Sequence, residues 1–117
     1  MKNKNKNSIC IVGLGYVGLP LAVAFAEKFQ VVGFDIDSTR IQELEDGCDK
    51  TLEIEDDLLS SVKSNITYTS DIEDIKNCNI YIVTVPTPID KTNRPDLTPL
   101  VESSRTIGAV LSKDDIV

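Results

Sequence analysis

The chain has 117 residues, of which 41% are hydrophobic and 26% are charged, enough apolar material for the core of one domain. Its formal net charge of −7 argues against partners that bind through clustered positive charge, namely nucleic acid and anionic membrane surfaces. No apolar run approaches the roughly 20 residues needed to cross a bilayer, so we expect a soluble, cytoplasmic protein with no membrane partner.

The first seven residues, MKNKNKN, are not followed by the apolar segment and small-residue cleavage site of a secretory signal. We expect residues 1–7 to be a disordered tail and residues 8–117 to form the domain. Residues 8–13 (SICIVG) are apolar up to a glycine, which predicts a strand covered on both faces, as in a parallel sheet. Residues 16–28 then place apolar side chains at helical spacing, with Pro20 in the first turn, where its missing N–H costs nothing.

A second strand and a second helix follow. Residues 31–37 (VVGFDID) form an apolar run that ends in two aspartates. Residues 38–47 place Ile41 and Leu44 on one helical face and end in Gly47, a residue typical of helix C-termini. The pattern up to this point therefore predicts a strand, a helix, a strand and a helix.

The middle of the chain is less regular. We expect a short helix around residues 55–63 and a third strand at residues 66–70 (ITYTS). Ser70 and Glu73 have the spacing of a capping box, which predicts a helical turn at residues 71–76.

The clearest strand is at residues 79–86 (NIYIVTVP), because it is rich in β-branched residues and ends in proline. Residues 86–97 hold three of the five prolines and predict a defined loop. Thr98 followed by Pro99 predicts an N-cap and a first helical position, opening a helix that continues to about Leu111.

Alternating strands and helices, with strands that are apolar throughout, predict an α/β fold with a Rossmann-type doubly wound parallel sheet. Residues 112–117 (SKDDIV) predict the approach to a further strand. Ligands of such sheets bind at the carboxyl ends of the strands. We therefore expect residues 13–18, 35–37 and 86–90 to converge on one crevice.

Three of the six glycines lie in the motif Gly13-Leu14-Gly15-Tyr16-Val17-Gly18, between a predicted strand and a predicted helix. Asp35 follows Gly13 by 22 residues, close to the roughly 20 of a dinucleotide fingerprint. In that interpretation Gly13 allows the tight turn, Gly15 lets the backbone approach a pyrophosphate, and Gly18 lets the helix pack closely on the strand. The alternative is that the glycines serve only a tight turn.

The acidic residues after the second strand favour NAD as the cofactor. The Asp35 carboxylate can accept hydrogen bonds from both hydroxyls of the adenosine ribose, and its charge repels a 2′-phosphate. Arg40 leaves two alternatives open, because it could stack near the adenine or pair with the 2′-phosphate of NADP. With Asp35 and Asp37 beside it, we favour NAD.

Metal chemistry has little support in the sequence. The chain has no histidine, and its three cysteines, Cys10, Cys48 and Cys78, form no CxxC pair. We expect Cys10 and Cys78 to be buried hydrophobes and Cys48 to lie in a polar loop. The acidic run from Glu43 to Asp57 lacks the alternate-position ligands of a calcium loop, so we interpret it as a solvated face and predict no metal site.

Several motifs together resemble the N-terminal domain of the UDP-glucose/GDP-mannose dehydrogenase family, from about Ile9 to the end of the chain. They are GLGYVGLPLA, VVGFDID with Arg40 after it, VPTPID and RPDLTPL. With TLEI at residues 51–54, they look most like the branch that oxidises UDP-N-acetylhexosamines for bacterial capsule, Vi-type or O-antigen polysaccharides.

The resemblance implies a four-electron oxidation, in which two NAD molecules in succession take hydride from the C6 alcohol of a UDP-sugar to give a uronic acid. It also implies a homodimeric full-length enzyme with a catalytic cysteine in a C-terminal half. None of the three cysteines of this chain falls at that position, so we expect a fragment that has no catalytic residue and is inactive alone.

By position, the resemblance implies that residues 13–18 hold the pyrophosphate and that Asp35 and Arg40 hold the adenosine end. It also implies that a further set of residues lines the cofactor, with the last of them nearest the nicotinamide: Val83, Thr84, Val85, Pro86 and Thr87. Thr84 and Thr87 have the alternative of being ordinary strand-end residues.

Two other functions stay open. A chain without catalytic groups could be a stand-alone module that senses NAD or binds nucleotides with a partner. It could also be part of another Rossmann enzyme, of the 2-hydroxyacid or 6-phosphogluconate type, although the VPTP loop differs from those.

Overall fold

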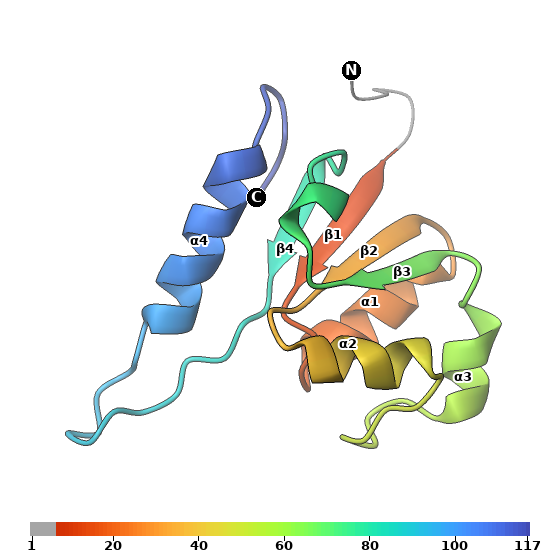
Figure 1. Cartoon of the computed structure of the whole chain (residues 1–117), viewed down its shortest axis with the longest axis horizontal. Coiled ribbons are helices and arrows are strands. Elements are labelled where there is room, and N and C mark those ends of the chain that lie inside the picture. The colour runs from red at the N-terminus through yellow and green to blue at the C-terminus, as the bar shows by residue number, and fades with distance from the viewer. Residues whose placement is uncertain (1–6) are drawn as a thin grey trace.

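The computed structural model describes residues 7–117, so of the predicted tail only Asn7 lies within the described residues. Four parallel strands form one sheet in the order β3-β2-β1-β4 (Figure 1). The strands are β1 (Ser8–Val12), β2 (Gln30–Phe34), β3 (Ile66–Thr69) and β4 (Ile80–Val83). The strand at the start of the chain therefore lies in the middle of the sheet, between β2 and β4.

Alternate residues of β1 point to opposite faces of the sheet and supply two separate cores. Ile9 and Ile11 pack with residues of α1 (Gly18–Ala26), α2 (Ser38–Glu45) and α3 (Asp56–Ser61). Cys10 and Val12 pack in the second core with Ile107 of α4 (Thr98–Val110). Helices thus cover both faces of a parallel sheet, and the predicted Rossmann-type doubly wound fold is confirmed.

The predicted strands and helices are all present, but several predicted boundaries are wrong. β2 ends at Phe34 and not at Asp37, and α1 spans Gly18–Ala26 and not residues 16–28. Glu73 N–H is capped by the Asp71 side chain instead of Ser70, and the segment is a single 3₁₀ turn, η1 (Ile72–Asp74). Thr98 does not cap α4, because it is the first residue of the helix: Leu97 holds the N-cap position, and no side chain caps the helix. β4 ends at Val83, before the predicted Pro86.

The end of the chain returns to the sheet. Ile116 makes a parallel bridge with Ile80 on the edge of β4 that β1 does not occupy. SKDDIV therefore approaches the position of a further strand, as predicted. Within the described residues, no helix has both the length and the apolar character that a bilayer crossing requires.

The cysteines lie where the sequence predicts. Cys10 and Cys78 are buried in the second core, and Cys48 is exposed. The hydrogen bond between the two buried thiols, together with burial, raises the pKa of Cys10 far above its ordinary range, so this side chain is a neutral hydrophobe.

Candidate functional site

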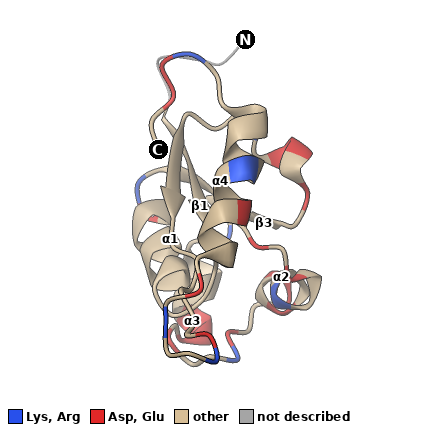
Figure 2. Ribbon diagram, turned by 90° about the vertical axis from the view of Figure 1, so that its left-hand side faces the viewer, with Lys and Arg blue, Asp and Glu red and all other residues tan. Residues whose placement is uncertain are grey.

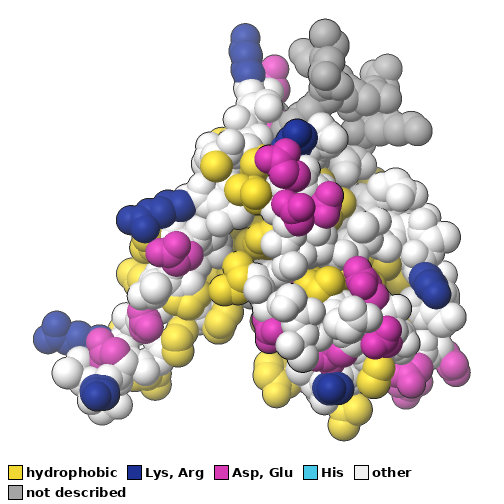
Figure 3. All heavy atoms as spheres, viewed as in Figure 1, with side chains coloured by type: hydrophobic (Ala, Val, Ile, Leu, Met, Phe, Trp, Pro, Cys, Tyr) yellow, Lys and Arg dark blue, Asp and Glu magenta, His cyan; other side chains and the backbone are white. Residues whose placement is uncertain are grey.

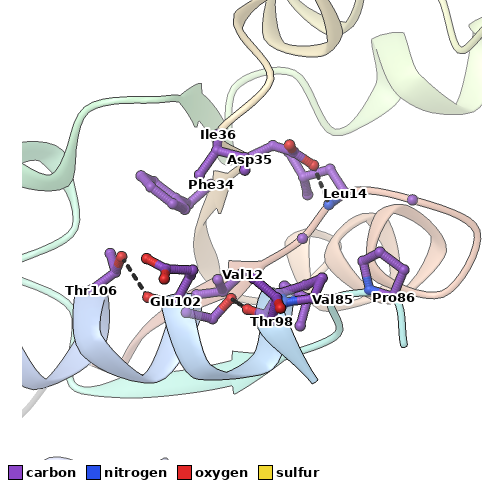
Figure 4. Close-up of a pocket in the computed structure, with 14 residues that line it drawn as sticks. Val12, Leu14, Phe34, Asp35, Ile36, Val85, Pro86, Thr98, Glu102 and Thr106 are labelled. Atoms are coloured by element: carbon purple, nitrogen blue, oxygen red, sulfur yellow. Dashed lines mark hydrogen bonds between the residues drawn. The ribbon is translucent and has the colours of Figure 1, made fainter. Parts of the chain in front are cut away.

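A cavity of about 440 Å³ lies at the carboxyl ends of β1 and β2, with α4 as its opposite wall (Figure 4). The space-filling view shows a hollow between the segment that carries α4 and the rest of the domain, bordered by hydrophobic side chains (Figure 3). The lining residues are Val12, Gly13, Leu14, Gly15, Phe34, Asp35, Ile36, Val85, Pro86, Thr98, Pro99, Glu102, Ser103 and Thr106. The structure thus brings together the glycine turn, the end of β2 and the start of the proline loop, as predicted.

Two of the three motif glycines are required by the chain itself. Gly13 has φ +100°, and a Cβ there would meet the Thr84 carbonyl oxygen at 3.0 Å. A Cβ on Gly18 would overlap the Gly13 carbonyl oxygen, with the Thr84 hydroxyl oxygen 2.5 Å away. These two positions keep the start of α1 close to β1 and β4, which is the packing role expected of them.

Gly15 is different, because nothing in the chain requires it. Its φ is not among the positive values, and a Cβ built there meets no protein atom within 4 Å. It lines the cavity, two residues after Gly13. The missing side chain therefore leaves open space at the N-terminal end of α1, where unpaired backbone N–H groups and the helix dipole favour an anion.

Asp35 links the end of β2 to the glycine turn. One carboxylate oxygen accepts a hydrogen bond from Leu14 N–H at 2.9 Å, and the other accepts one from Asp37 N–H at 2.9 Å. Each oxygen keeps lone-pair capacity, and the half-buried side chain borders the cavity. The carboxylate can therefore accept hydrogen bonds from a ribose while it holds the turn.

Arg40 lies elsewhere than the sequence suggests for an adenosine contact. Its side chain is buried and does not line the cavity. Its Nε–H donates to the Leu14 carbonyl oxygen at 2.8 Å, and its Nη1–H donates to Asp49 at 2.8 Å and to Glu43 at 3.0 Å. Arg40 therefore contacts the glycine turn through the Leu14 carbonyl oxygen, outside the cavity lining. Its role at the adenosine end stays a prediction.

Asp49, which the sequence analysis placed in a solvated acidic face, is a fully buried anion. It accepts hydrogen bonds from Arg40, from Thr51 and from the backbone N–H groups of Glu53 and Ile54. Burial alone would raise its pKa, but the hydrogen bonds from Thr51, Arg40 and the backbone outweigh this effect and lower the pKa to about 2.

The other acidic residues of this region gather around α2 and α3 (Figure 2). Most of them are exposed, as a solvated face requires. No group of three or more acidic or cysteine side chains within the described part of the chain is arranged to hold a metal ion.

The predicted residues around the end of β4 have four different placements. Val85 and Pro86 line the cavity. Thr84 lies behind the lining, where its hydroxyl donates to the Gly13 carbonyl oxygen at 2.7 Å. Val83 packs against the second core, and Thr87 is exposed and outside the lining.

Tyr16 and Val17 complete the predicted set. Both side chains are exposed, at 69% and 66%, and neither lines the cavity. At these two positions only the backbone of the turn is available to a ligand in the cavity, because the side chains are exposed to solvent.

The wall formed by α4 was missed by the sequence analysis. Pro99, Glu102, Ser103 and Thr106 lie at helical spacing on one face of this helix and border the cavity. The same spacing in the sequence was a signal that could have identified them. Phe34, which precedes Asp35, was also missed, whereas Ile36 belongs to the segment 35–37 that was expected at the crevice.

The α4 wall offers hydrogen-bond acceptors to the cavity. The Ser103 hydroxyl donates to the Pro99 carbonyl oxygen at 2.7 Å, and the Thr106 hydroxyl donates to the Glu102 carbonyl oxygen at 3.0 Å. With both hydroxyl protons used within the helix, Ser103 and Thr106 present oxygen lone pairs, as does the Glu102 carboxylate, one oxygen of which also accepts from Arg105 at 3.3 Å. Such a wall suits a flat apolar group whose edge carries an amino donor.

These features fit a dinucleotide. The open space at Gly15 suits a diphosphate, the Asp35 carboxylate suits ribose hydroxyls, and the acceptor wall of α4 suits the amino group of adenine.

Comparison with known proteins agrees with this geometry. The family model for the UDP-glucose/GDP-mannose dehydrogenase family, NAD binding domain, matches residues 7–117. A UDP-N-acetyl-D-glucosamine 6-dehydrogenase from Pseudomonas aeruginosa is 55% identical over 109 residues, which are 93% of this chain and 26% of that protein. Protein CapL from Staphylococcus aureus is 51% identical over 113 residues, 97% of this chain and 26% of its own length.

Solved structures show the same similarity. A UDP-D-ManNAc dehydrogenase from Pyrococcus horikoshii superposes with a TM-score of 0.87 at 36% identity, covering 93% of this chain and 27% of that chain. A GDP-mannose dehydrogenase from Pseudomonas aeruginosa, solved as a ternary complex, gives 0.80 at 28% identity, covering 86% and 24%. The chain thus spans about a quarter of the length of the relatives it matches.

Proposed function

The chain belongs to the UDP-glucose/GDP-mannose dehydrogenase family as an NAD-binding domain, and from that premise we propose that it serves the oxidation of a UDP-N-acetylhexosamine to a uronic acid. The relatives named as UDP-N-acetyl-D-glucosamine 6-dehydrogenases support this substrate class, at 54% and 55% identity. Such a product would be consumed in the synthesis of a surface polysaccharide.

The observation that carries the proposal is the open space at Gly15. Packing explains Gly13 and Gly18, whereas a Cβ on Gly15, which borders the cavity, would meet no protein atom within 4 Å. A diphosphate at this point explains the glycine, because its oxygens would approach the backbone N–H groups at the start of α1.

The remaining residues have roles that follow from their chemistry. Asp35 would accept hydrogen bonds from the ribose, and Ile36 would cover one face of the adenine. Glu102 and its neighbours on α4 would accept from the adenine amino group. When bound, NAD supplies a hydride acceptor, and the residues after β4, with Thr87 furthest along, would lead toward its nicotinamide end.

We also propose that this chain does not turn over alone. A four-electron oxidation of this kind needs a nucleophile and a proton-transfer group. The cavity lining of the described residues contains no cysteine, lysine or histidine, and its carboxylates are assigned to the ribose and the adenine. The UDP-sugar partner, the homodimeric assembly and the cytoplasmic location of an entire enzyme stay predictions.

Calorimetric titration with NAD tests the cofactor assignment. We expect binding by the wild-type chain and binding weaker by about tenfold in Asp35→Asn, since one charge-assisted interaction is lost. Asp46→Asn, which changes an exposed carboxylate at the end of α2, is the matched control. A folded chain that does not bind NAD contradicts the proposal.

The substrate class is tested in a protein that joins this domain to the remaining three-quarters of a relative's length. NADH formation from UDP-N-acetylglucosamine, with two NADH per sugar, is the expected result. Turnover with UDP-glucose alone would overturn the substrate assignment. NAD binding by this domain without turnover of any UDP-sugar in the longer protein would favour an NAD-sensing module.

A further inference from the structure

The peptide unit between Gly13 and Leu14 is held at both ends by side chains that follow two other strands. Its carbonyl oxygen accepts a hydrogen bond at 2.7 Å from the hydroxyl of Thr84, directly after β4. Its N–H group donates at 2.9 Å to the carboxylate of Asp35, directly after β2 (Figure 4). A peptide unit is planar, so the position of its carbonyl oxygen also sets the direction of its N–H group. The Thr84 hydroxyl therefore influences how Leu14 N–H meets Asp35.

The Gly13 carbonyl oxygen depends on this hydroxyl for its hydrogen bond. Within residues 7–117, no other group donates to that oxygen. The backbone of Thr84 is held independently, because its N–H donates to the Val12 carbonyl oxygen at 2.8 Å. Loss of the hydroxyl would therefore leave the strand pairing in place and the Gly13 carbonyl oxygen without a donor.

The Thr84 hydroxyl lies between the glycine turn and the start of α1. A Cβ on Gly18, the first residue of α1, would stand 2.5 Å from the hydroxyl oxygen. The threonine is half-buried and does not line the cavity, and its hydroxyl proton is used by the Gly13 carbonyl oxygen. An effect of this hydroxyl on a ligand in the cavity must therefore pass through the peptide that it holds.

We infer that Thr84 is a positioning residue for the cofactor, whose hydroxyl orients the peptide between Gly13 and Leu14 and thereby holds the Asp35 carboxylate for the ribose. The hydrogen bond to the carbonyl oxygen polarises the peptide, which strengthens the hydrogen bond from its N–H to Asp35. A carboxylate that is oriented before binding loses less conformational freedom when the ribose hydroxyls bind. This inference rests on the proposed binding of NAD.

Calorimetric titration of Thr84→Ala and Thr84→Ser with NAD tests the inference. Both variants lose the methyl group of threonine, so they differ from each other only in the hydroxyl. We expect the serine variant to bind like the wild type and the alanine variant to bind about three- to tenfold more weakly, the value of one hydrogen bond. Thr67→Ala makes a similar change at an exposed position of β3 and should leave the affinity unchanged. Equal affinity of the alanine and serine variants would overturn the inference.

A purely structural role of the hydroxyl predicts a different result in a second background. Asp35→Ala removes the carboxylate through which Thr84 is inferred to act. Thr84→Ala should therefore have little further effect on NAD affinity when it is combined with Asp35→Ala. A hydroxyl that only supports the turn would weaken binding by the same factor in both backgrounds, and that result would contradict the inference.

The amide proton of Leu14 gives a readout that needs neither NAD nor a change at Asp35. In NMR spectra of the free chain, its resonance should move upfield in Thr84→Ala and stay in place in Thr84→Ser, because a weaker hydrogen bond deshields the proton less. An unchanged resonance in Thr84→Ala would contradict the inference.

Thr84→Val keeps the shape of the side chain and replaces Thr84→Ala if the alanine variant does not fold. It should also bind NAD more weakly than the serine variant, and equal affinity would again contradict the inference. Failure of the wild-type chain to bind NAD overturns the proposed function, and this inference with it. A wild-type chain that binds NAD, with the hydroxyl-free variants binding equally well, overturns the inference alone.

Discussion

The three motif glycines separate into those that the protein needs and one that a ligand needs. Gly18 contacts Gly13 so closely that no side chain fits, whereas Gly15 borders open space. Substitution by alanine distinguishes the two roles, since the added methyl group meets a backbone atom at Gly18 and open space beside the cavity at Gly15.

Gly15→Ala should leave the free energy of unfolding unchanged or raise it by about 0.4–1 kcal/mol, because alanine restricts the unfolded chain and suits the backbone conformation. NAD affinity should fall by about tenfold or more, since the methyl group occupies the proposed diphosphate space. Urea unfolding and calorimetry measure the two quantities.

Gly18→Ala is the matched control for this prediction. It should lower the free energy of unfolding by several kcal/mol, on the order of the largest values for single substitutions, because the Gly13 carbonyl must move. Normal NAD affinity in Gly15→Ala would show that the open space is not used by the cofactor.

Among single residues, the sequence predicted those that can be identified from their type and their spacing along the chain. The glycine motif and Asp35 are identified by type and spacing, and the structure gathers them at one cavity. The burial of Arg40 and Asp49 was not predicted, because it depends on a loop that folds back over α2. In the sequence, Asp49 is one of eight acidic residues between Glu43 and Asp57, and nothing in its type or spacing separates it from the exposed ones.

At the level of elements, the loop from Cys48 to Ile54 is organised by one ionised carboxylate. The pKa of Asp49 falls from an ordinary 3.8 to about 2 in the folded protein. Because the folded value is the lower one, the ionised form stabilises the fold above about pH 4. This contribution is lost as the pH falls from about 4 to about 2.

Asp49→Asn should therefore be less stable than the wild type at pH 7, and the difference should shrink by about 2 kcal/mol between pH 7 and pH 2. Urea unfolding of both proteins at several pH values measures it. A difference that does not vary with pH would mean that the charge of Asp49 does not stabilise this loop.

Helix α4 supplies the acceptor wall, and an analogue of the cofactor tests it. Replacing the adenine of NAD by hypoxanthine exchanges the amino donor for a carbonyl acceptor, which would face Glu102 and two hydroxyl oxygens. We expect weaker binding by about tenfold, since the carbonyl oxygen of hypoxanthine would face oxygen acceptors and find no donor among them.

Glu102→Ala serves as the control, because it should reduce the discrimination between the two dinucleotides. Calorimetric titrations of both proteins with both compounds give the comparison. Equal affinity of the wild type for the two compounds would contradict the assignment of α4 as the adenine wall.

The elements themselves were well predicted, and the errors lie at their ends. Apolar runs and helical spacing identified the strands and α4, because these patterns follow from burial. η1 is capped by Asp71, next to the predicted Ser70, whereas α4 has no side-chain cap: Leu97 holds its N-cap position, between Asp96 and the predicted Thr98. Composition alone does not decide between such neighbours. Which face of α4 meets the cavity follows from how the sheet and helix pack.

For the whole molecule, the fold places every part of the site at one edge of the sheet. The glycine turn follows β1, Asp35 follows β2, Val85 follows β4, and α4 closes the opposite side (Figure 4). A parallel sheet brings these segments together although they are distant in sequence. The family model for the NAD binding domain matches residues 7–117, which agrees with a cofactor site at this edge of the sheet.

The central claim is that this cavity binds the adenosine diphosphate half of NAD, and amide NMR of the labelled chain during titration with NAD tests it most directly. We predict that the largest shift changes occur at Gly15, Ile36 and Glu102, with the face of the sheet covered by α3 unaffected. Saturable changes confined to residues outside the cavity, or none at millimolar NAD, would contradict the account.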